Sequence, residues 1–168
     1  KKHITRNSMP YIIAEIGVNH EGKLNQALEL IDLAKEGGAD AAKFQTYKAE
    51  KLASKYSPAY WDTKKEPTLS QYELFKKYDG FNEKDYKKLA NHCEDINIDF
   101  ISTPFDSEAV DYLEPIVPFY KIASADITNK PMLKQIADTN KPIVLSTGAS
   151  NLSEIKEAIS IIESNGCK

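Results

Sequence analysis

Short apolar runs recur along the chain, and each has the length of a single buried strand. Most of their residues are apolar instead of alternating with polar ones, which is typical of strands covered on both faces in a parallel sheet. Five runs are predicted as strands, at residues 11–16, 40–46, 99–103, 119–123 and 142–146.

Segments with helical spacing separate these runs. In the first, residues 25–36, the apolar side chains repeat at the spacing of one buried helix face before Gly37 and Gly38 end the helix. Strands that alternate with helices predict an α/β fold with parallel strands, because the helices serve as crossovers. About five such units are predicted, with helices at residues 25–36, 70–78, 82–96, 107–113, 130–138 and 152–164.

One connection is unusually long. Residues 47–67 show no clear periodicity, and excursions of this length in compact domains are usually functional lids or binding loops. Its aromatic residues Tyr56, Tyr60 and Trp61 are expected to pack the loop onto the body of the protein instead of stacking on a substrate.

Polar residues lie at or just after the ends of the predicted strands. In a parallel array all strand carboxyl ends meet at one face, so these side chains are expected to converge. Two lysines, several hydroxyls and a glycine-containing loop form a natural site for an anion, which favours a phosphate or carboxylate ligand. The converging residues are Glu15, Lys43, Gln45, Thr103, Lys121, Ser124 and Ser146.

Simpler roles remain open for several of these residues. A lysine in an apolar strand can extend outward to solvent, but two in equivalent positions favour an anionic partner, since an unpaired buried ammonium is unfavourable. Glu15 is left open between a structural ion pair with such a lysine and a catalytic role. Thr103 is left open between a ligand contact and a strand stop before Pro104, and His20 is expected to shape its loop.

Composition excludes some classes of protein. The 168 residues are 41% hydrophobic and 28% charged with a net charge of −3, which is ordinary for one globular domain and lacks the basic face of nucleic-acid binders. The apolar runs fall far short of the ~20 residues that span a membrane. Residues 1–9 do not have the pattern of a secretory signal, and Cys93 and Cys167 lie in no metal or redox motif, so a reduced cytoplasmic setting is expected.

Five segments together resemble the sialic acid synthase family, in order and at the family's spacing. They are YIIAEIGVNHEG at 11–22, ADAAKFQT at 39–46, FISTPF at 100–105, YKIAS at 120–124 and IVLSTG at 143–148. The resemblance implies part of a (β/α)8 TIM-type barrel. It also implies condensation of phosphoenolpyruvate with an N-acetylmannosamine-type amino sugar, which forms a nonulosonic acid and releases phosphate with the help of Mn²⁺ or Mg²⁺.

The resemblance also implies roles for individual residues. Glu15 is similar to the carboxylate that handles water or a proton near the reacting carbon, and Gln45 to a sugar contact. Members that make N-acetylneuraminate usually carry glutamate where this chain has Asp126, so the identity of the sugar is open. Gly148 is expected to allow close approach of the backbone, and the phosphoenolpyruvate contacts are expected to be Lys43, Thr103, Lys121, Ser124 and Ser146.

A closed barrel of this type needs eight strands and roughly 250 residues. Residues 1–168 are therefore expected to be the N-terminal part, about five-eighths of a barrel, inactive alone. The family's metal ligands and antifreeze-like domain are expected later, in a protein that is a homodimer at full length. The alternatives are a synthase of octulosonate or heptulosonate phosphates, disfavoured because Arg6 is the single arginine, and a non-catalytic half-barrel that binds or scaffolds.

Overall fold

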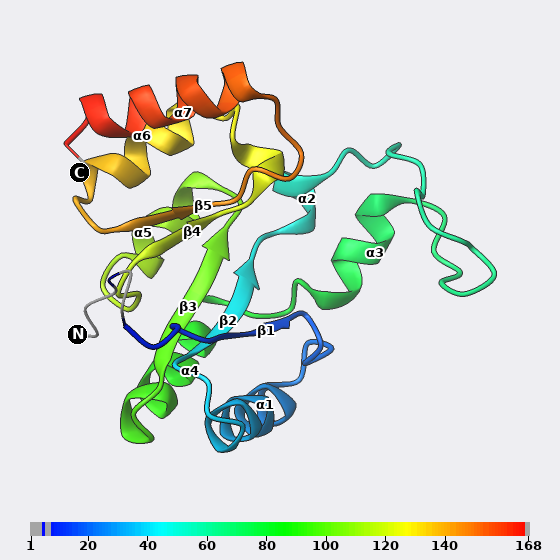
Figure 1. The fold of residues 1–168 in the computed structure, drawn as a ribbon. Helices are drawn as coiled ribbons and strands as arrows, with labels where there is room; N and C mark the ends of the chain where they lie inside the picture. Colours follow the sequence, from blue (N-terminus) through cyan, green and yellow to red (C-terminus); the bar gives the residue numbers. More distant parts are fainter. Residues whose placement is uncertain (1–4, 6–7, 167–168) are drawn as a thin grey trace.

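The fold is an array of parallel strands with helices along one side (Figure 1). The computed structural model describes residue 5 and residues 8–166. Strands β1, β2 and β3 form one hydrogen-bonded sheet in that order, and β4 pairs with β5. β4 lies beside β3, so the five strands follow one another in chain order. Their bounds are β1 Ile13–Gly17, β2 Ala41–Thr46, β3 Asp99–Pro104, β4 Tyr120–Ile122 and β5 Ile143–Leu145.

Five of the helices described below, all but the first two, begin at residues whose side chains accept hydrogen bonds from free backbone N–H groups. Asn82 and Asn151 each open a helix with a complete capping box, and Asp106 accepts a hydrogen bond from the Ala109 N–H. The helices are α1 Leu24–Glu36, α2 Ala49–Leu52, α3 Gln71–Tyr78, α4 Glu83–Asp95, α5 Ser107–Leu113, α6 Lys130–Asp138 and α7 Leu152–Ser164, with a 3₁₀ turn η1 at Ser124–Asp126.

The α/β class and the alternation of strands and helices are confirmed, with one correction at a strand end and one helix that was not predicted. The third strand does not stop before Pro104, which pairs with Thr46 at its end. Proline is tolerated there because the ladder uses the next N–H, from Phe105 to the Thr46 carbonyl, at 3.1 Å. The short helix α2 was not predicted, since its four residues are too few to show a period.

Alternate strand residues divide between two faces. One face packs against the helices and contributes large buried side chains to the core, including Phe44, Phe100 and Tyr120. The opposite face is the inner one, where Lys43, Gln45 and their neighbours in adjacent strands lie. The buried core therefore fixes which strand residues are presented on the inner face.

The long connection between α2 and α3, residues 53–70, extends away from the body (Figure 1). We call it the excursion. It folds on itself, with a backbone bridge between Pro58 and Ser70 and a 3.1 Å hydrogen bond from Trp61 Nε1 to the Glu66 carbonyl. Tyr56 and Tyr60 are 94% and 75% exposed, so the expectation that they pack onto the body is wrong. Trp61 is half-buried and packs edge-on against Tyr60 within the excursion.

Cys93 is a buried free thiol in α4, and burial raises its pKa to about 12. Cys167 lies outside the described residues. Among the helices that the structure describes, none combines the length and apolar character needed to cross a bilayer.

Candidate active site

An ion pair between a buried lysine and an exposed glutamate lies on the inner face. Lys43 Nζ donates a 2.8 Å hydrogen bond to Glu15 Oε2, across the β1–β2 register that places these residues opposite each other. The Lys43 side chain is 6% exposed and that of Glu15 is 62% exposed. Glu15 is thus the partner that compensates a cation held away from water, which supports the ion-pair reading left open above.

Lys121 lies on the same face, in β4. Its Nζ donates a 2.9 Å hydrogen bond to the Ile122 carbonyl. Its pKa is lowered, first by burial and then by repulsion from Lys43, with Glu15 acting in the opposite direction. Tyr120 and Ile122, on either side of Lys121, lie in the buried core, as Ala42 and Phe44 do beside Lys43, so strand alternation places both lysines on the inner face.

Gln45 and Thr103 are paired across β2 and β3, one step toward the strand ends from Lys43. Thr103 is 2% exposed and its Oγ1 has no hydrogen-bond partner among the described residues. Such a buried unpaired hydroxyl is unfavourable unless a ligand or water completes it. Behind this face, the Gln45 carbonyl accepts a 2.9 Å hydrogen bond from the buried Tyr86 hydroxyl.

The remaining predicted residues lie beyond the ends of β4 and β5. Ser124 and Asp126 begin and end η1, and burial raises the pKa of the Asp126 carboxyl, whose Oδ2 has no partner among the described residues. Ser146 is held to β4 by a 3.1 Å hydrogen bond from its N–H to the Ile122 carbonyl. A Cβ at Gly148 would meet nothing within 4 Å, so its role stays a prediction.

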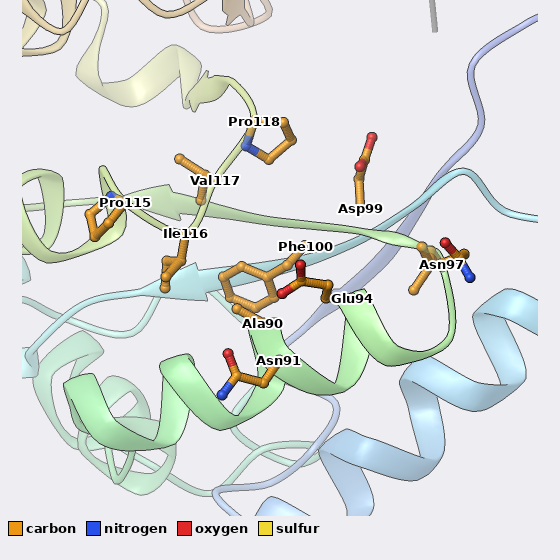
Figure 2. A pocket seen from close by; sticks show the side chains of 11 residues that line it. Ala90, Asn91, Glu94, Asn97, Asp99, Phe100, Pro115, Ile116, Val117 and Pro118 are labelled. Atoms are coloured by element: carbon orange, nitrogen blue, oxygen red, sulfur yellow. The ribbon is translucent and has the colours of Figure 1, made fainter. Parts of the chain in front are cut away.

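A cavity of about 600 Å³ contains none of these residues. It lies at the other end of β3, where α4 and the segment 115–118 flank Asp99 and Phe100 (Figure 2). The candidate site is therefore separate from this cavity.

Lys48 is a residue that sequence reasoning missed. Its Nζ donates hydrogen bonds to the carbonyls of Asp79 and Phe81, at 2.8 and 2.9 Å. These bonds hold the segment that follows α3 against the segment that follows β2. Asp79 adds a 3.1 Å hydrogen bond from the Ala49 N–H. A lysine that binds carbonyls some thirty residues away carries no local sequence signal.

No group of three or more His, Cys, Asp or Glu side chains suited to a metal ion is found within the described part of the chain. These residues therefore do not fit the divalent cation that the resemblance implies.

The fold and the inner face define a class of protein: a parallel α/β array with a cationic, hydroxyl-rich site at its strand ends. The sequence model of the NeuB family matches residues 30–168, and the chain belongs to that family. It is 45% identical over 160 residues to the N,N'-diacetyllegionaminic acid synthase of Campylobacter jejuni, covering 94% of this chain. The chain spans about half the length of the curated relatives that it matches, 48% in this case.

Solved structures support the same assignment. An N-acetylneuraminic acid synthetase from Leptospira borgpetersenii, solved with citrate, superposes with a TM-score of 0.80 at 33% identity, over 99% of this chain and 56% of that one. A heptulosonate-type aldolase, the DAHP synthase of Thermotoga maritima, superposes with a TM-score of 0.67 at 14% identity over 94% of this chain and 39% of that one, and shows the fold alone. The resemblance to the sialic acid synthase family is thus confirmed, as is a partial (β/α)8 barrel.

Proposed function

We propose that this chain supplies the phosphoenolpyruvate half-site of a nonulosonic acid synthase. In the whole enzyme, phosphoenolpyruvate condenses with an N-acetylmannosamine-type amino sugar to give the nonulosonic acid and phosphate. The observation that carries the proposal is the placement of Lys43 and Lys121 on one face, with Glu15 as the counter-ion of Lys43. The named relatives support the class of reaction.

The two ammonium groups would neutralise the carboxylate and phosphate of this small, highly charged substrate. Thr103 would donate its unpaired hydroxyl, and Ser124 and Ser146 would add hydroxyl donors from the ends of β4 and β5. An anion bound between the lysines would restore the lowered pKa of Lys121, so charge neutralisation and binding reinforce each other.

The sugar side of the proposal concerns other residues. Glu15 would move to the water or proton near the reacting carbon once an anion replaces it at Lys43. Gln45 and Asp126 would contact the amino sugar, and the Asp126 Oδ2, which has no partner among the described residues, would form a hydrogen bond to it. The requirement of the whole enzyme for Mn²⁺ or Mg²⁺ remains part of the proposal, with no ligand assigned to it among the described residues.

Calorimetric titration of the chain with phosphoenolpyruvate tests the half-site. Removal of one charge-assisted contact should weaken binding roughly tenfold or more, so Lys121→Ala should bind far less tightly than the parent chain. The control is Lys156→Ala, at an exposed position in α7, which should bind as the parent does. No binding by the parent chain at millimolar ligand would instead favour the non-catalytic scaffold.

The heptulosonate phosphate class is the second candidate. Its substrates carry a phosphate on the sugar as well, for which additional arginines are expected, and Arg6 is the single arginine of the sequence. The match to the Campylobacter synthase at 45% identity favours the nonulosonic acid class over this alternative.

A further inference from the structure

His20 is the most enclosed side chain of the loop that follows β1. It is 1% exposed, and its ring stacks on Phe81 with the centroids 4.3 Å apart and the planes 14° from parallel. Phe44, in β2, lies against it at 5.9 Å between centroids. The ring therefore contacts both the strand that carries Lys43 and the segment after α3 that contains Phe81, which is the base of the excursion.

The hydrogen bond of this ring defines its charge state. The Gly22 N–H donates to Nδ1 at 3.0 Å, so Nδ1 carries no proton and the imidazole is neutral with its proton on Nε2. Burial lowers the pKa of His20, and a hydrogen bond with the Gly17 backbone acts in the opposite direction. A second proton would abolish the Gly22 bond and place a cation between two aromatic rings in an apolar enclosure.

The loop starts where the strand register is irregular. The β1–β2 pairing shifts between Glu15 and Gly17, and Gly17 has a φ of +58°. Past the shift the ladder holds a single further pair, Gly17 with Phe44, so the direction of the backbone beyond it depends on where the loop is held. On the other side, Phe81 is held by the 2.9 Å hydrogen bond from Lys48 to its carbonyl.

We propose that His20 is a positioning residue of this half-site: its neutral imidazole locks residues 17–22 against β2 and the excursion base, and thereby keeps Glu15 beside Lys43. The significance for catalysis rests on the proposed function, whereas the anchoring of the loop does not. His20 itself does not touch the substrate. The charged or titratable groups on the elements packed around it are Glu21, Lys23, Lys43, Lys48, Asp79 and Tyr86.

Two variants separate the chemistry of the ring from its bulk. His20→Leu fills the space but offers no acceptor to the Gly22 N–H. His20→Asn places an uncharged acceptor oxygen near the position of Nδ1 and does not titrate. Hydrogen exchange of peptides covering residues 13–24 should rise several-fold in His20→Leu and stay near the parent rate in His20→Asn, with residues 152–164 in α7 as the internal control.

Acidification adds a readout that a purely structural role would not give. Because the folded-state pKa is lowered, the neutral ring stabilises the loop at neutral pH, and this contribution is lost as the pH falls through that pKa, below the ordinary value of about 6.5. Exchange of residues 13–24 relative to α7 should therefore rise in the parent chain near pH 5 and stay level in His20→Asn.

A double-mutant cycle connects the loop to the half-site. Glu15→Gln and His20→Leu should each change the phosphoenolpyruvate dissociation constant, and the effect of His20→Leu should disappear in the Glu15→Gln background because it acts through that carboxylate. Additive effects would overturn the proposal, as would parent-like exchange in His20→Leu. If the parent chain does not bind phosphoenolpyruvate, the proposed function fails, and the exchange measurements alone decide the role of His20.

Discussion

At the residue scale, the two lysines of the inner face differ in how they are compensated. Lys43 has the carboxylate of Glu15 at 2.8 Å, whereas Lys121 donates to a neutral carbonyl and is repelled by Lys43. The site thus carries more positive than negative charge in the absence of ligand. A bound anion would give Lys121 the negatively charged partner that it lacks. The pKa of Lys121 should therefore respond to binding more strongly than that of a lysine already paired with a carboxylate.

The pH dependence of binding follows from this difference. The pKa of Lys121 is lowered in the free chain, and anion binding needs the protonated form. Phosphoenolpyruvate affinity should therefore be full at neutral pH and fall as the pH rises through the lowered pKa, which lies below the ordinary value of 10.5. Calorimetric titrations from neutral to alkaline pH check this.

Lys121→Arg is the matched control, because a guanidinium stays charged throughout this range. Its affinity should be lower or similar at neutral pH, but should not fall on the alkaline side. A parallel alkaline loss in Lys121→Arg would show that another group titrates.

At the scale of elements, the excursion is held at its base by a small polar network. Lys48 binds two carbonyls, and the buried Asp79 carboxylate accepts from the Ala49 N–H and pairs with Lys76 at 3.2 Å. These contacts close a segment of some thirty residues with few apolar side chains buried inside it. Its order depends on the network at its base more than on a core of its own.

Lys48→Met tests this dependence. The substitution leaves the carbonyls of Asp79 and Phe81 without their charged donor, which should cost about 1.5 to 3 kcal/mol of unfolding free energy. It should also speed proteolysis within residues 53–70. Urea unfolding and limited proteolysis measure the two effects, and Lys55→Met, at an exposed position in the excursion, should change neither.

Elements were predictable where the signal is local. Helices α4 and α7 begin at asparagines that form capping boxes, and the helical periodicity behind each is continuous. The inner-face lysines were predictable because strand alternation and parallel topology together place them. The fold of the excursion was not, since Lys48 acts on residues distant in sequence, and neither were the unpaired atoms of Thr103 and Asp126, which depend on every neighbour that surrounds them.

At the scale of the whole molecule, both ends of the strand array are open within the described residues. β1 and β5 each pair with a strand on one side alone. Ile12, just before β1, and Val144, in β5, are 53% and 42% exposed, which is unusual for apolar residues of a parallel sheet. Unpaired strand edges with exposed apolar side chains are templates for association.

The chain as given should therefore self-associate in a concentration-dependent manner, which sedimentation velocity would detect. Val144→Lys should weaken association, because a charge on the edge strand β5 opposes pairing with another edge. Leu69→Lys, which alters a 73% exposed side chain on the excursion instead, should leave it unchanged. A monomer that unfolds in one cooperative transition would show that these edges are stable in water and would contradict an open barrel that needs a partner.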